Sequence, residues 1–92
     1  MNMIILDKDE SVLNHFRKLE EEVDELKTEL MLKDLKNEDN DNHIKEECLD
    51  VIQVCLGILD KYKVTEKDIL RHVEKLEKRR WKAKKVIKLE VM

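Results

Sequence analysis

Four acidic residues have the spacing of a metal site on two helices. Glu22 and Glu25 are three residues apart in one charged stretch, and Glu47 and Asp50 are three apart in a second. Residues at this spacing share one face of a helix. If the two stretches form facing antiparallel helices, the four carboxylates surround one space. An anionic site made only of oxygen ligands suits a hard divalent cation, most commonly Mg²⁺ where a phosphate also coordinates.

The position of Glu47 in its helix supports this interpretation. At about 100° per residue, Glu47 projects between Val54 and Ile58, inside an apolar arc, and Asp50 lies at the edge of that arc. An ionised carboxylate on a buried face is costly unless a cation or another partner compensates it. A metal site and a buried ion pair between Glu47 and a lysine both satisfy this condition, and chance spacing in a charged helix is the simplest alternative.

Two long helices must position these carboxylates. We expect the first to begin near Asp9 or Ser11, either of which can cap it, and to end at about Leu35. Its apolar residues alternate at spacings of four and three, a heptad-like stripe. The polar, Asn/Asp-rich segment from Lys36 to His43 is predicted to be a loop. The second helix is expected from about Asn42 to Tyr62.

A third helix and a tail follow. Thr65 is a suitable cap, with Asp68 three residues later in a variant of the capping box, and the helix is expected to run to about Lys84. Its apolar stripe consists of Ile69, Leu70, Val73 and Leu76. The alternating apolar residues of the tail, Ile87, Leu89 and Val91, predict a short strand or a docking arm.

The second helix carries apolar residues over well over half of its circumference. A lone three-helix chain of 92 residues would struggle to cover it. We therefore expect residues 1–92 to form a single all-α domain, a helical bundle completed by homodimerisation. Its four-helix core would combine the first two helices of two subunits, as a homodimer or a tetramer.

Charge is divided unevenly along the chain. Residues 1–63 hold 9 Lys/Arg and 17 Asp/Glu, a net charge of −8, whereas residues 64–92 hold 10 and 5, a net charge of +5. An acidic part beside a basic part could hold a cation and a polyanion together, although a solvated charged surface explains the same pattern. The overall acidity and few aromatics argue against a nucleic-acid partner.

Cellular location is suggested by the cysteines and by the lack of long apolar runs. Cys48 and Cys55 are seven residues apart, so in a helix their Cα atoms lie roughly 10.5 Å apart, too far for a disulfide. They are expected to be small core residues in a reducing compartment. The apolar run from Met1 to Leu6 is too short for a signal peptide, and no run is long enough to cross a membrane. We expect a cytoplasmic protein with no membrane partner.

Two short segments resemble a known family. Residues 18–26, Lys-Leu-Glu-Glu-Glu-Val-Asp-Glu-Leu, look like the first-helix signature of the all-α nucleoside triphosphate pyrophosphohydrolases, and residues 47–52, Glu-Cys-Leu-Asp-Val-Ile, look like the second. Together they match the pattern ExxE, a gap, then ExxD. The MazG-like branch is the most similar, and the resemblance covers roughly residues 12–82. The basic segment of the third helix, Lys75 to Lys85, lacks the longer C-terminal motif of full-length MazG domains.

The resemblance implies a function and a set of site residues. The expected reaction is Mg²⁺-dependent hydrolysis of a nucleoside triphosphate, (d)NTP, to the monophosphate and pyrophosphate, with Mn²⁺ as a substitute cofactor and a role in nucleotide pool control. The implied metal ligands are Glu22, Glu25, Glu47 and Asp50. The implied catalytic carboxylates, which orient or deprotonate water, are Glu21 and Glu22. The implied substrate-binding residues are Lys75, Arg79 and Lys18.

A different class of function also fits the pattern. The chain could be a non-catalytic helical interaction module, whose heptad-like first helix pairs with a partner helix. In that case the carboxylates are solvated, and divalent ions do not change the stability of the protein. The wide apolar arc of the second helix fits a compact bundle better than a two-stranded coil.

Overall fold

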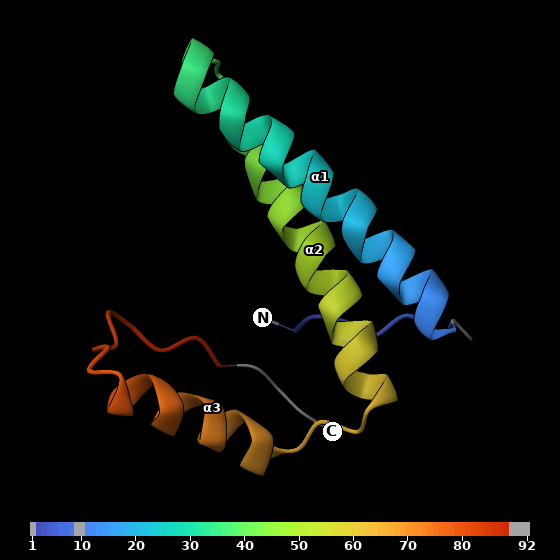
Figure 1. The fold of residues 1–92 in the computed structure, drawn as a ribbon, viewed down its shortest axis with the longest axis vertical. Helices are drawn as coiled ribbons and strands as arrows, with labels where there is room; N and C mark the ends of the chain where they lie inside the picture. Colours follow the sequence, from blue (N-terminus) through green and yellow to red (C-terminus); the bar gives the residue numbers. More distant parts are fainter. Residues whose placement is uncertain (1, 9–10, 89–92) are drawn as a thin grey trace.

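The computed structural model describes residues 2–8 and 11–88 and contains three helices in this part of the chain. They are α1 (Val12–Lys36), α2 (Asp41–Lys61) and α3 (Glu66–Lys78). The α1 and α2 helices pack against each other as an antiparallel hairpin, whereas α3 lies apart and makes no close backbone contact with either (Figure 1). The expectation of an all-α chain is confirmed.

Specific caps set the ends of the hairpin. Ser11 is the N-cap of α1, as expected, and its side chain accepts a hydrogen bond from the backbone N–H of Asn14 at 3.2 Å. Asn37 ends α1 in the left-handed conformation, with φ 49°, which Asn tolerates better than most residues. The loop is therefore shorter than predicted, because both helices extend into the segment from Lys36 to His43.

The buried side chain of Asn40 ties the two helices together at this turn. Its amide Nδ2 donates to the backbone carbonyl of Glu29 at 2.9 Å and to Oε2 of the same residue at 2.7 Å. Lys33 of α1 also pairs with Asp41 at the start of α2, at 3.0 Å. These contacts fix the register of the hairpin, and therefore which residues of α1 and α2 face each other.

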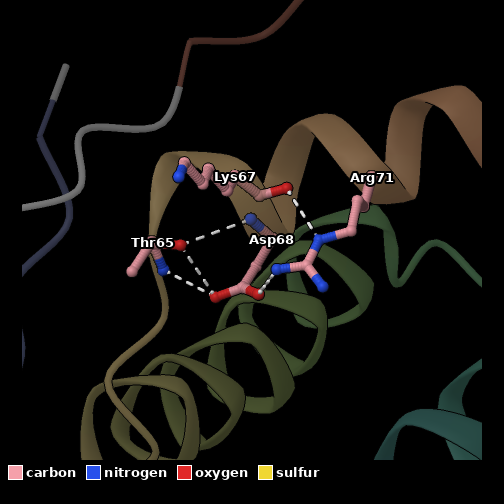
Figure 2. Close-up of polar contacts among 4 residues, drawn as sticks. All are labelled: Thr65, Lys67, Asp68 and Arg71. Carbon is pink, nitrogen blue, oxygen red and sulfur yellow. Dashed lines mark hydrogen bonds and ion pairs between the residues drawn. The ribbon is translucent and has the colours of Figure 1, made fainter.

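A compact corner joins α2 to α3. Lys63 is left-handed, with φ 56°, and its N–H donates to the carbonyl of Asp60 while the N–H of Val64 donates to Leu59. This pair of bonds is the Schellman arrangement that ends a helix. The next residue, Thr65, already caps α3 in a full capping box with Asp68 (Figure 2). The two motifs are directly adjacent, since Val64 belongs to the first and Thr65 to the second.

The prediction that the third helix continues to about Lys84 is wrong. The α3 helix ends at Lys78, because Arg80 adopts φ 65° and a second Schellman arrangement forms, with Arg80 N–H bonded to Glu77 and Trp81 N–H to Leu76. The described tail, residues 81–88, contains no strand. The predicted alternation also involves Leu89 and Val91, which lie outside the described residues.

The single chain has little buried core. Among the described residues, Leu56 of α2 is the one buried hydrophobic residue, while Leu49 and Ile52 of the same helix are 53% and 43% exposed. The expected burial of α2 on most sides is therefore not achieved within one chain, and homodimerisation stays a prediction. Within residues 2–8 and 11–88, no helix has the length and apolar character needed to cross a membrane.

Candidate metal centre

Three of the four predicted carboxylates converge between α1 and α2. Glu22 of α1 and Glu47 and Asp50 of α2 each place one oxygen within 4.8 Å of the others. The antiparallel packing brings these residues together from positions about 25 apart in the sequence. Three carboxylate oxygens so close together repel each other unless a cation or a proton lies between them.

Burial makes the arrangement costly for the protein alone. Glu22 is only 6% exposed, and it is a buried charged residue in a chain with little core. Oε2 of Glu22 and Oε2 of Glu47 are both inaccessible to solvent and lack hydrogen-bond partners in the described part of the chain. Buried polar atoms nearly always have a partner. Two such oxygens in one cluster fit the open ligand positions of a divalent cation.

The environment of Glu47 also changes its proton affinity. Burial raises the pKa of Glu47 to about 7, with further contributions from hydrogen bonding and repulsion by Glu25 and from the charges of Asp50 and Glu22. At neutral pH a substantial fraction of this carboxyl therefore carries a proton when no cation is bound. A divalent cation would displace that proton and favour the ionised form.

Glu25 has a different position from the other predicted ligands. Its side chain is exposed and does not belong to the converging triad, yet it lies near enough to hydrogen-bond Glu47. The geometry therefore brings together Glu22, Glu47 and Asp50 directly, and Glu25 through Glu47. A carboxylate that contacts a ligand residue can orient that residue toward a cation.

The side chain of Lys18 forms an ion pair with a carboxylate of the cluster. Its Nζ lies 2.9 Å from Oε1 of Glu22 and 3.6 Å from Glu21. The hydrogen bond and the charge of Glu22, followed by the charge of Glu21, raise the pKa of Lys18. Glu21 itself is exposed and lies outside the triad. Lys18 thus neutralises one oxygen of Glu22 and leaves the other without a partner.

A pocket of about 410 Å³ opens beside the carboxylates. Glu22, Lys18 and Asp50 line it, together with residues of the N-terminal arm and of the second half of α2. Its volume lies within the range of small-molecule sites, roughly 300–1,000 Å³. The pocket therefore has room for a ligand that also reaches the triad.

The N-terminal arm forms one wall of this pocket. The side-chain amide of Gln53 donates to the backbone carbonyl of Ile4 at 2.7 Å and holds the arm against α2. On the opposite helix, His15 approaches Gly57, where an added Cβ would lie 3.6 Å from the imidazole Cε1. The N-terminal arm therefore lies at the site.

The predicted phosphate-binding pair lies elsewhere in the chain. Lys75 lies in the last turn of α3 and Arg79 is its C-cap, and the backbone N–H of Arg79 bonds to the carbonyl of Lys75 at 3.2 Å. Neither lines the pocket, and α3 does not pack on the hairpin. Within one chain, the structure does not bring these two residues to the carboxylates.

Several polar residues that line the pocket were missed by the sequence analysis. They are Lys8, Gln53, Asp60 and Lys61. Helical spacing offered a signal for those on α2, since Gln53 and Asp60 continue the face of Asp50 at three- and seven-residue steps. No local signal identified Lys8, because its place depends on how the N-terminal arm crosses the hairpin.

Comparisons of the chain with protein-family models, curated proteins and solved structures found no match. The interpretation of this site therefore depends on its own geometry and chemistry.

Proposed function

We propose that this protein is a Mg²⁺-dependent nucleoside triphosphate pyrophosphohydrolase of the MazG-like type. The observation that supports the proposal most is the convergence of Glu22, Glu47 and Asp50 around two buried, unpartnered carboxylate oxygens. A hard divalent cation satisfies such oxygens. The adjacent pocket of about 410 Å³ lies within the size range of small-molecule sites.

In the proposed reaction, a water oxygen forms a bond to the α-phosphorus of the nucleotide. The bond from phosphorus to the bridging oxygen breaks, and pyrophosphate leaves with that electron pair. The proton of the water passes to Glu21 or Glu22 as general base. Bound Mg²⁺, or Mn²⁺ in its place, would neutralise phosphate charge and lower the pKa of water.

The basic residues take complementary roles in this proposal. Lys18 lines the pocket beside Glu22, so its ammonium group can contact a phosphate oxygen of a bound substrate. Lys75 and Arg79 would stabilise the charge that builds on the leaving pyrophosphate. Because these two lie away from the site in a single chain, their contribution requires the homo-oligomer expected from the exposed apolar residues of α2.

The alternative of a non-catalytic interaction module is supported by the exposed apolar side chains of the hairpin. Phe16, Leu30 and Leu49 are between 48% and 57% exposed and could contact another protein. That function does not account for the buried Glu22 or for the two unpartnered oxygens. The effect of Mg²⁺ on stability distinguishes the hydrolase from the interaction module, because an interaction module without a metal site should not be stabilised by Mg²⁺.

Pyrophosphate release tests the proposal. The folded protein is incubated with a panel of dNTPs and NTPs in Mg²⁺ and in EDTA, alongside Glu47→Ala and the control Glu46→Ala, which alters an exposed neighbour. The proposal predicts Mg²⁺-dependent release by the wild type and the control, and its loss in Glu47→Ala. Absence of release with every nucleotide would favour the interaction module.

A further inference from the structure

The α3 helix has an apolar face that its own chain does not cover. Leu70 and Val73 on this face are 59% and 44% exposed, and Trp81 just beyond the helix is 70% exposed. None of α3 packs closely on α1 or α2 (Figure 1). A helix of 13 residues is rarely stable in water without tertiary packing, so this face is expected to have a partner.

The corner between α2 and α3 holds α3 away from its own hairpin. The Schellman bonds of Lys63 and Val64 end α2, and Val64 is half-buried, as the apolar residue of that motif commonly is. In the capping box that follows, the backbone N–H of Thr65 donates to Asp68 Oδ2 at 2.8 Å, and Arg71 pairs with Oδ1 of the same carboxylate at 3.1 Å (Figure 2). The two adjacent caps leave no flexible linker between α2 and α3, which favours the observed separation of α3 from its own hairpin.

The charge of the chain indicates what the partner is. The α3 helix and the tail belong to the part with net charge +5, and the segment from Lys78 to Lys88, which includes the end of α3, contains seven basic residues and no acidic one. The hairpin belongs to the part with net charge −8, and it exposes apolar residues such as Phe16 and Ile52. A second copy of the hairpin therefore offers both the opposite charge and the apolar surface that α3 lacks.

We propose that α3 and the basic tail of one chain dock on the α1–α2 hairpin of a second copy, so that Lys75 and Arg79 reach the carboxylate site in trans. Each site then combines the acidic triad of one subunit with the basic residues of the other. The exchange is reciprocal, which gives a closed twofold dimer. The role of the two basic residues toward phosphate rests on the proposed function, whereas the docking itself does not.

Zero-length crosslinking of isotopically mixed protein tests the docking without any activity. Wild-type protein labelled with ¹⁵N is refolded with an equal amount of unlabelled protein, and lysines are coupled to carboxylates with a carbodiimide. The proposal predicts that about half of the peptides joining residues 64–88 to the hairpin are of mixed isotope, because random pairing of two equal pools makes half of the dimers hybrids. Crosslinks within one isotope only, which indicate α3 folded back on its own chain, would overturn it, as would the lack of any crosslink between α3 and the hairpin.

Mixing two inactive variants tests the shared site. Glu47→Ala retains the basic residues, and Lys75→Ala/Arg79→Ala retains the triad. Half of the dimers in an equal, co-refolded mixture are hybrids with one intact site of two, so the mixture should regain about a quarter of wild-type activity. If the wild type is active but the mixture of the two variants regains no activity, the shared site is refuted and the proposed function still stands. An inactive wild type with mixed-isotope crosslinks would refute the proposed function and leave the docking standing.

Discussion

The ammonium group of Lys18 lies 2.9 Å from Oε1 of Glu22, one helical turn away, while Oε2 of the same carboxylate is buried without a partner. Glu22 is thus half neutralised by its own helix. One oxygen of Glu22 also lies within 4.8 Å of carboxylate oxygens of Glu47 and Asp50. Glu22 therefore lies close to both Lys18 and the other two carboxylates of the triad.

Replacing Lys18 with Met should destabilise the protein when no divalent cation is present. The variant removes the lysine from Oε1 of the buried Glu22, whose Oε2 already lacks a partner, and an unsatisfied buried group costs about 1–3 kcal/mol. Because Lys18 is half-exposed, we expect a loss of about 1 kcal/mol in the free energy of unfolding. Urea titrations in EDTA measure this loss, and added Mg²⁺ should recover most of it. A variant as stable as wild type in EDTA would show that Glu22 does not need the lysine.

The stability of the metal-free protein should fall as the pH rises from about 4.5 to about 7. The folded-state pKa of Glu47 is raised from 4.5 to about 7, so the folded protein binds more protons than the unfolded chain in this window, and the stabilisation is lost as pH passes the folded pKa. Thermal melts in EDTA at several pH values measure the effect. Glu47→Gln should remove this part of the pH dependence, and an unchanged profile in that variant would contradict the assignment.

Mg²⁺ should stabilise the protein through the triad. A ligand at about 100 times its Kd stabilises the folded state by about 2.7 kcal/mol, so melts in Mg²⁺ and in EDTA should differ by several degrees for the wild type. Glu22→Gln and Asp50→Asn should lose most of that difference, whereas the exposed control Glu46→Gln should keep it. An equal Mg²⁺ response in all four proteins would place the cation elsewhere.

Thr65→Ala should loosen α3 and leave the hairpin intact. The hydroxyl accepts from the N–H of Asp68 and the variant loses this cap (Figure 2), at a typical cost of about 1 kcal/mol to the helix. Amide hydrogen exchange should therefore accelerate in residues 66–78 but not in α1. The backbone and side-chain bonds from Thr65 lower the pKa of Asp68, so the same loosening should appear in wild type as the pH falls through that pKa. Equal protection of α3 in both proteins would contradict the role of the capping box.

The sequence predicted the helices well because their signals are local. Ser11 and Thr65 cap the helices as expected, since a cap depends on residues within one turn. The end of α3 was placed too late because Arg80 adopts a left-handed conformation that favours Gly or Asn. Nothing in its residue type signals that conformation.

The site was only partly predictable for a similar reason. Carboxylate spacing on two helices indicated which side chains share a face, and Glu22, Glu47 and Asp50 do converge. Spacing within a helix does not give the register between helices, which here depends on the contacts of Asn40 with Glu29. For the same reason the sequence offered no indication that α3, with its basic residues, would turn away from its own hairpin.

The most direct test of the central claim is to identify the products formed from a nucleoside triphosphate in Mg²⁺, by ³¹P NMR, for the wild type, Glu47→Gln and Glu46→Gln. The proposal predicts monophosphate and pyrophosphate in equal amounts from the wild type and the Glu46 variant. It predicts an at least roughly hundredfold slower reaction for the Glu47 variant, because that variant removes a ligand of the proposed cation. Diphosphate and inorganic phosphate as products, or an unaffected Glu47 variant, would contradict it.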